Sequence, residues 1–111
     1  MEIAEQHFND VVVLILDGNL MGGPEAVALN ETVNRFLDEN NLKVVIDLQK
    51  VERVNSSGLG ILIKALTTFK NNGGELKLCN VSPKIGKLLD ITKLDSILDV
   101  FESVDSAVHS F

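Results

Sequence analysis

The chain has 111 residues, 45% of them hydrophobic and only 5% aromatic, which suits a single domain with a mainly aliphatic core. Sixteen acidic residues against ten basic ones give a net charge of −6. This sign disfavours binding to nucleic acid or to an anionic membrane surface, because both usually depend on basic patches.

The predicted elements alternate between strands and helices. In chain order they are strands at 3–8 and 11–17, a helix from Pro24 to a stop at 40–41, a strand at 43–47, a helix at 57–71, a strand at 75–79, a helix at 83–89, a short edge strand at 97–101 and a terminal helix at 104–110. Asn9 and Asp10 form a tight turn, so the first two strands are expected to be antiparallel. The alternation that follows predicts an α/β fold with a largely parallel sheet and right-handed crossovers.

Apolar periodicity predicts which faces are buried. The second strand is apolar at nearly every position, which is typical of a central strand covered on both faces. The core stripes of the first two helices recur at helical spacing. They are Ala26, Leu29, Val33 and Phe36 in the first helix, and Leu59, Leu62, Leu66 and Phe69 in the second.

The start of the second helix is the most informative segment of the chain. The apolar run Val44–Ile46 is followed by a polar stretch that ends in Asn55-Ser56-Ser57, and an apolar helix pattern begins at once. Backbone N–H groups at a helix start have no partner within the helix, so a serine there can cap it. The same groups and the helix dipole also favour a phosphate. Two interpretations therefore remain open. Either the serines only cap the helix, or they also carry a signalling site. In both cases Ser57 is the expected cap.

The glycines that follow match neither a Walker loop nor a dinucleotide-binding fingerprint. Without side chains, Gly58 and Gly60 let another backbone approach the helix start. That backbone belongs either to a neighbouring segment of this chain or to a docked partner.

A second, weaker strip on the same helix consists of Ile61, Lys64, Ala65 and Thr68. Their spacing places them on one side of the helix. Either this strip packs against the third helix, or it is a protein-docking surface with the serines at its rim.

No catalytic, metal or cofactor site is predicted. His7 and His109 lie at opposite ends of the chain with no ligand-spaced companions. Cys79, the only cysteine, lies in an alternating strand pattern and is expected to be a small buried hydrophobe rather than a reactive thiol. We therefore expect a protein that is not an enzyme.

Neither a signal sequence nor a membrane span is expected. The segment Met1–Glu5 is acidic and mixed, unlike a basic region followed by an apolar one. The longest apolar run, Val11–Leu16, is far shorter than the ~20 residues that cross a bilayer. We expect a cytoplasmic protein.

The serine segment also resembles a known family. A strand that ends in Asp-Leu, then Val-x-x-Val, then Asn-Ser-Ser-Gly-Leu-Gly and an apolar helix is similar to the STAS domain of bacterial anti-sigma factor antagonists. Four further segments match in the same order, namely 11–21, 73–83, 88–94 and 104–108, with Asp105 or Ser106 where Glu is usual. The resemblance implies one STAS-type domain over residues 1–111, with a mixed, mostly parallel sheet of four to five strands and about four helices.

In this family the serine just after the Asp or Asn is the regulatory phosphorylation site, which corresponds here to Ser56, with Ser57 as the fallback. The resemblance implies a partner switch that regulates transcription. The unmodified protein binds an anti-sigma factor that is also a serine kinase, phosphorylation releases it, and a PP2C-type phosphatase restores it. We expect a monomer or a weak dimer with no cofactor. The expected partner-binding residues are Asn55, Ser56, Ser57, Gly58, Gly60, Ile61 and Lys64.

One departure from the family pattern bears on this function. Most phosphorylated members carry Asp where this chain has Asn55, and the loss of a charge beside Ser56 affects kinase recognition or phosphate release. The alternative is a STAS scaffold subunit that is never phosphorylated, for example in a lipid-transport or signalling complex. The net charge and the absence of an apolar membrane-facing helix count against this alternative, and Asn55 counts for it. A third possibility is a small nucleotide-binding or catalytic protein, but the chain shows neither a phosphate-binding loop nor a catalytic base.

Overall fold

The computed structural model describes all residues from Met1 to Phe111 and contains a five-stranded sheet in the order β1-β2-β3-β4-β5. The elements are β1 (Glu2–Phe8), β2 (Val11–Leu20), α1 (Pro24–Asp38), β3 (Lys43–Val54), α2 (Ser56–Asn71), β4 (Glu75–Cys79), α3 (Pro83–Ile91), a 3₁₀ helix η1 (Leu94–Ser96), β5 (Asp99–Phe101) and α4 (Val104–His109). Strand β1 is antiparallel to β2, and the other neighbouring strands are parallel. The α/β fold class and the mixed, mostly parallel sheet with four α-helices are confirmed.

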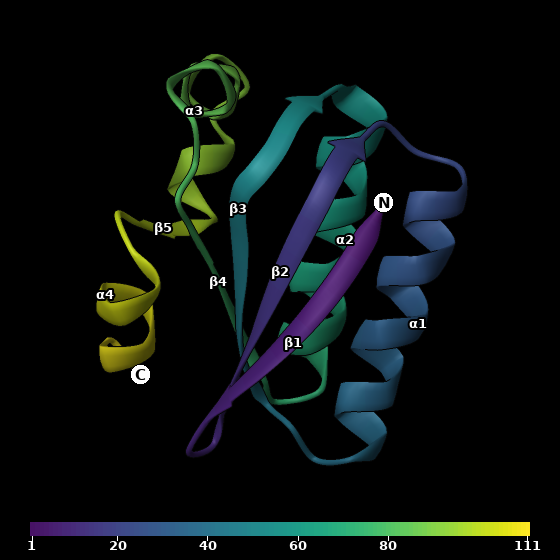
Figure 1. Cartoon of the computed structure of the whole chain (residues 1–111), viewed down its shortest axis with the longest axis vertical. Helices are drawn as coiled ribbons and strands as arrows, with labels where there is room; N and C mark the ends of the chain where they lie inside the picture. Colours follow the sequence, from purple (N-terminus) through teal and green to yellow (C-terminus); the bar gives the residue numbers. More distant parts are fainter.

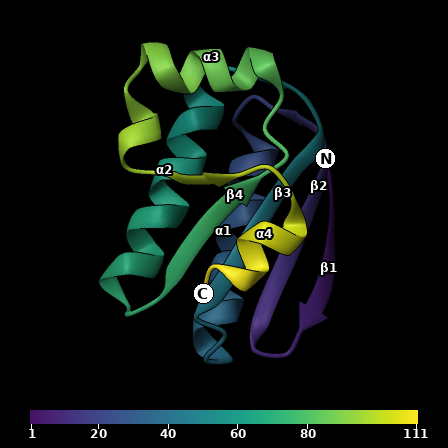
Figure 2. The ribbon, with the colours of Figure 1, turned by 90° about the vertical axis from the view of Figure 1, so that its left-hand side faces the viewer.

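The helices lie on both faces of the sheet and across one end of it. Helices α1 and α2 lie on one face, α4 lies on the other, and α3 lies across the end toward which the parallel strands run (Figures 1 and 2). The larger hydrophobic core lies between the sheet and the helices α1, α2 and α3, whereas a smaller cluster of Val11, Val13, Val45, Cys79 and Ala107 lies beneath α4. The central strands are thus covered on both faces, as their continuous apolar runs predict.

The predicted helical stripes are confirmed with one exception. Helix α1 buries Leu29, Val33 and Phe36, while Ala26 is only half-buried. Helix α2 buries all four of its predicted stripe residues and Ala65 as well. Helix α1 begins at Pro24, where a missing backbone N–H costs nothing because the first turn has no acceptor for it.

The main differences from the predicted boundaries are in the strands. Strand β3 continues to Val54 instead of ending at Asp47, because its polar second half still pairs with β2 as far as Leu20. Two register shifts interrupt that pairing. Strand β4 stops pairing with β3 at the Asp47–Cys79 pair, so β3 beyond this point has a neighbouring strand on one side only. Strand β5 is shorter than predicted, because a 3₁₀ helix precedes it.

A buried carboxylate marks the point where β3 and β4 part. Asp47 is only 6% exposed, and its Oδ1 accepts hydrogen bonds from the backbone N–H of Gln49 and from Nδ2 of Asn80, both at 3.0 Å. Buried carboxylates need such partners, because an unpaired one would carry a large desolvation cost. Asn80 has a positive φ of 55°, a conformation that Asn tolerates better than most residues.

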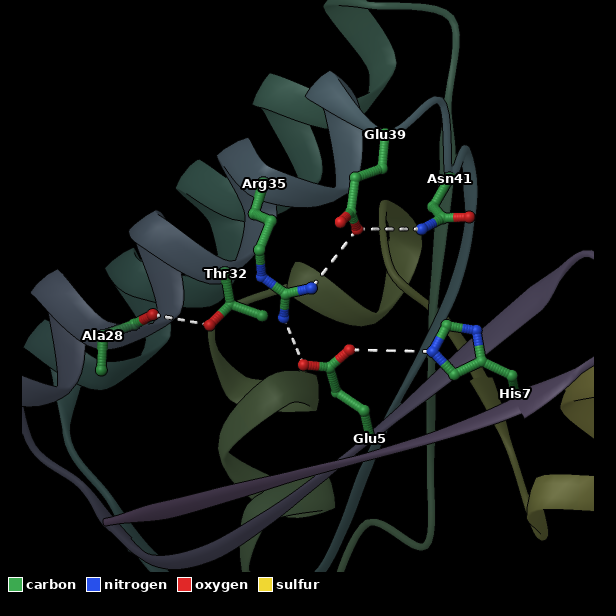
Figure 3. A network of polar contacts seen from close by, with 7 residues as sticks. All are labelled: Glu5, His7, Ala28, Thr32, Arg35, Glu39 and Asn41. Carbon is green, nitrogen blue, oxygen red and sulfur yellow. Dashed lines mark hydrogen bonds and ion pairs between the residues drawn. The ribbon is translucent and has the colours of Figure 1, made fainter.

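A polar network joins β1 to α1 on the surface (Figure 3). The guanidinium of Arg35 contacts the carboxylates of Glu5 and Glu39, and its hydrogen bond to Glu5 raises the pKa of Arg35. His7 lies 3.8 Å from the other oxygen of Glu5. Exposed ion pairs of this kind contribute little to stability, and β1 is held in place mainly by its pairing with β2.

The C-terminal residues cover a lysine on the opposite face of the sheet. Lys77 is only 7% exposed, and its Nζ donates a hydrogen bond of 2.7 Å to Oγ of Ser110. The same ammonium lies 4.2 Å from the ring centroid of Phe111 and 5.3 Å from that of Phe101. The aromatic rings thus take the place of part of the water around the buried charge.

This arrangement predicts that the ring face of Phe111 stabilises the fold. Phe111→Leu should lower the free energy of unfolding by about 0.5–2 kcal/mol, the usual range of a cation–π contact. Phe111→Tyr keeps an aromatic face and should stay close to the unmodified protein. Urea unfolding of both variants tests this, and equal stabilities for Leu and Tyr would contradict it.

Candidate functional site

The candidate site is the start of α2, and Asn55 caps this helix. Asn55 has an extended backbone, with φ −105° and ψ −175°, and its side chain accepts a hydrogen bond from the N–H of Gly58 at 2.8 Å. Its carbonyl oxygen accepts the first helical bond, from Leu59, at 2.9 Å. The expectation that Ser57 is the cap is therefore wrong, and the helix begins one residue earlier than predicted. Asn caps a helix as well as Ser does, so local preference does not separate the two.

Because Asn55 provides the cap, the two serine hydroxyls are not needed for it. Ser56 and Ser57 occupy the first two helical positions and both are exposed. Their own N–H groups precede the first residue that can find an acceptor in the helix. The first turn of α2 contains no acidic residue. The positive end of the helix dipole is therefore exposed beside two free hydroxyls.

Gly58 brings the start of α2 against the end of β2. A Cβ atom at this position would lie 1.8 Å from the carbonyl oxygen of Leu20 and 3.2 Å from Cγ1 of Val54. Only glycine permits this approach of two backbones. The neighbouring backbone is thus a segment of the same chain, which answers one of the two alternatives for Gly58. At Gly60 a Cβ would meet no atom within 4 Å, so that position faces open space.

The contact at Gly58 also places the β2–α1 loop beside the serines. Gly22 has a φ of 106°, and a Cβ there would lie 3.1 Å from Cβ of Ser57. Ser57 therefore lies against the loop, and Met21 in that loop is 42% exposed. Sequence reasoning missed Met21 and Gly22 as parts of the site. The Gly22-Gly23-Pro24 run marks the loop, but nothing local shows which helix it contacts.

The seven predicted partner-binding residues lie on one segment of α2 and its cap, with different exposures. Ser56, Ser57, Gly60 and Lys64 are exposed, Asn55 and Ile61 are half-buried, and Gly58 is buried. A partner can therefore reach the four exposed residues directly. Gly58 shapes the site from beneath.

The strip that begins at Ile61 faces α1. Ile61, Lys64 and Ala65 line a small cavity of about 40 Å³ together with Ala26 and Leu29 of α1. Of the two alternatives for this strip, packing against the third helix is therefore wrong, and the docking surface stays a prediction. Helix α3 lies at the end of the sheet instead (Figure 2).

Cys79 behaves as the buried hydrophobe that its strand pattern predicts. It is fully buried, and burial, with a smaller contribution from the nearby Asp47 carboxylate, raises the pKa of its thiol to about 12. The thiolate is the nucleophilic form, and the protonated thiol dominates at neutral pH. Cys79 is therefore not a reactive group.

No group of three or more His, Cys, Asp or Glu side chains is arranged to hold a metal ion. None of the helices is both long enough and apolar enough to cross a membrane.

Comparison with known proteins identifies the family. The STAS domain model matches residues 2–107. The chain belongs to the STAS domain family. This STAS domain is 25% identical to the anti-sigma F factor antagonist of Paenibacillus polymyxa over 111 residues, which cover 97% of this chain and 92% of that protein. It is 35% identical to the anti-sigma-B factor antagonist of Bacillus subtilis over 73 residues, covering 66% of this chain and 67% of the relative.

A solved structure shows the same fold. The Bacillus cell fate determinant SpoIIAA in its phosphorylated form superposes with a TM-score of 0.74 over 98% of both chains, at 15% identity. At this identity the likeness concerns the fold of the STAS domain alone.

The two glycines of the site give a matched pair of predictions. Gly58→Ala should destabilise the domain by about 1–3 kcal/mol or more, because the new methyl group meets a backbone carbonyl that cannot move aside. Gly60→Ala should instead stabilise it by about 0.5–1 kcal/mol, since alanine favours the helix and the position is open. Urea unfolding of both variants measures the difference. Equal stabilities would show that β2 and α2 are further apart than the contact at Leu20 requires.

The raised pKa of the Cys79 thiol predicts a loss of stability at high pH. In the unfolded chain a thiol ionises near ~8.5, whereas in the folded domain its pKa is about 12. The contribution of the protonated Cys79 thiol to the free energy of unfolding is thus fully present below pH ~8.5. It is lost as the pH rises toward 12, at up to about 1.4 kcal/mol per pH unit. Cys79→Ala should show a smaller fall in unfolding free energy between pH 9 and 11. Parallel curves for the two proteins would contradict the assignment.

Proposed function

We propose that this STAS domain is an anti-sigma factor antagonist that regulates transcription by partner switching. It binds an anti-sigma factor serine kinase through the exposed start of α2, and phosphorylation of Ser56 releases it. A PP2C-type phosphatase restores the binding form. The domain acts by binding and not as an enzyme, and the names of its relatives support the antagonist role.

The observation that carries this proposal is the exposed Ser56 beside a cap made by another residue. Because Asn55 caps α2, modification of Ser56 leaves the cap hydrogen bond to Gly58 in place. A phosphate adds roughly −1.5 to −2 charges, and the start of a helix accepts such a charge well. The fold therefore tolerates phosphorylation while a partner docked on the same surface does not.

Ser56 is a better acceptor than Ser57 for a steric reason. Ser57 lies against the β2–α1 loop at Gly22, and a kinase must reach the hydroxyl from the solvent side. Ser57 remains the fallback acceptor.

Asn55 changes the electrostatics of the switch compared with an Asp cap. The amide oxygen caps the helix without bringing a negative charge next to the phosphate. Since like charges destabilise each other at short range, a phosphorylated Ser56 meets less repulsion here than beside a carboxylate. This difference favours a longer-lived phosphorylated state.

Substitution of Ser56 tests the proposal. Ser56→Asp should keep the fold and raise the free energy of unfolding by about 0.3–1 kcal/mol, because a carboxylate at a helix start is favourable. The same variant should bind the partner at least tenfold more weakly, or about 1.4 kcal/mol. The variant is expected to gain stability and lose affinity because the helix dipole stabilises the new carboxylate within the domain, whereas the cost of removing water from that carboxylate arises only when the partner docks.

The partner is first captured from a native extract and identified together with the phosphosite by mass spectrometry. Thermal unfolding and affinity are then measured on Ser56→Asp, with the nearly isosteric but uncharged Ser56→Asn as the matched control. Ser56→Ala should abolish labelling by the kinase and ATP, and should change stability by less than about 0.5 kcal/mol. If Ser56→Asp binds the partner as tightly as the unmodified protein, the proposed switch is wrong. If labelling is lost in Ser57→Ala and not in Ser56→Ala, the phosphorylated residue is Ser57.

A further inference from the structure

A groove of about 300 Å³ lies between the end of β3 and α3. It exists because β3 runs on to Val54 after β4 has stopped pairing at Asp47. Beyond that point one edge of β3 has no neighbouring strand, and α3 lies beyond this edge (Figure 1). The groove is therefore a consequence of unequal strand lengths in a parallel sheet.

The floor of the groove is apolar. Ile85 is buried in the main core, and Val54 and Leu88 are half-buried and pack against it. Ile91, at the end of α3, also lines the groove and is 67% exposed. An apolar occupant would remove this side chain from water, which is favourable in proportion to the area covered.

The rim of the groove carries unpaired positive charge. Lys84 and Lys87 are three residues apart on α3 and both are exposed, so they lie on neighbouring turns of one helix face. The ion pairs of the chain join Glu5 with His7 and Arg35, Arg35 with Glu39, and Lys43 with Asp10. Neither rim lysine is therefore paired.

Glu52 is the one acidic residue that lines the groove. Two ammonium groups against one carboxylate leave the rim with a net positive charge, in a chain whose net charge is −6. A positive rim over an apolar floor complements a molecule with an anionic head and an apolar tail.

The size of the groove favours a small molecule over a protein. Its volume of about 300 Å³ is at the lower end of ligand pockets, which span roughly 300–1,000 Å³. Seven residues line it, whereas a stable protein interface uses about 20–30 residues on each side.

We propose that this groove binds a medium-chain amphipathic carboxylate, with the apolar chain on Val54, Leu88 and Ile91 and the carboxylate at Lys84 and Lys87. The groove adjoins the start of α2 through Val54, whose Cγ1 would lie 3.2 Å from a Cβ at Gly58. Binding of a carboxylate in the groove does not depend on an anti-sigma factor.

Decanoate is the probe, and decylammonium, with the same chain length and the opposite charge, is the matched ligand control. Amide chemical shifts of the isotope-labelled full chain are followed during titration below the concentration at which either probe forms micelles. Decanoate should shift the signals of the groove residues in a saturable way. Decylammonium should bind at least tenfold more weakly.

Protein variants separate charge at the groove from overall charge. Lys84→Gln with Lys87→Gln should weaken decanoate binding at least tenfold. The pair Lys50→Gln with Lys70→Gln, which changes the net charge equally at two exposed lysines that do not line the groove, should leave it unchanged. Ile91→Ser should also weaken binding.

Equal binding of the two probes, or unchanged affinity after loss of Lys84 and Lys87, would overturn the proposal. So would decanoate shifts outside the groove, or none at all. If decanoate leaves the groove unshifted and the captured partner protein shifts it instead, the groove belongs to a protein interface. The titration contains no partner protein. A negative result with decanoate therefore contradicts only the groove proposal, and not the proposed partner switch at Ser56.

Discussion

The close approach of two backbones at Gly58 is the constraint on which the site depends. The end of β2 and the start of α2 come so near that a methyl group would overlap the carbonyl of Leu20. This contact keeps the β2–α1 loop against Ser57 and leaves Ser56 facing solvent. Leu20, whose carbonyl makes this contact, also pairs with Val54 just before the helix begins. A side chain at Gly58 would therefore disturb the end of the sheet and the start of α2 together.

The separation of capping from signalling follows from that geometry. Asn55 satisfies the backbone N–H of Gly58, and this hydrogen bond does not involve either serine. A domain whose helix was capped by the modified residue would lose a stabilising contact with each phosphorylation. Here Ser56, the proposed phosphorylation site, and Asn55, the cap, are adjacent but distinct, so a charge can be added at the surface while the helix start keeps its shape. This is the physical condition that a reversible partner switch requires.

Unequal strand lengths have a second consequence at the same end of the molecule. Asp47 of β3 and Asn80, just after β4, form a partly buried hydrogen bond at the point where the two strands separate. Beyond it, α3 takes the place that a strand would have. A helix cannot follow a strand edge as closely as another strand does, and the space left between them is the groove with its lysine rim. The start of α2 and the groove therefore both adjoin the end of β3, where Val54 pairs with Leu20 and also lines the groove.

The sequence by itself determined the local features of this protein. Continuous apolar runs predict the central strands, the spacing of Leu59, Leu62, Leu66 and Phe69 predicts the buried face of α2, and the motif around Ser56 indicates the STAS family. Only the tertiary structure decided which residue caps α2, how far β3 extends and which helix faces Ile61. How far β3 extends and which helix faces Ile61 depend on partners distant in the chain, whereas the cap is a local hydrogen bond from Gly58 to Asn55. Asn55 and Ser57 have equal local preference for the cap, and the polar end of β3 becomes a strand only because β2 lies beside it.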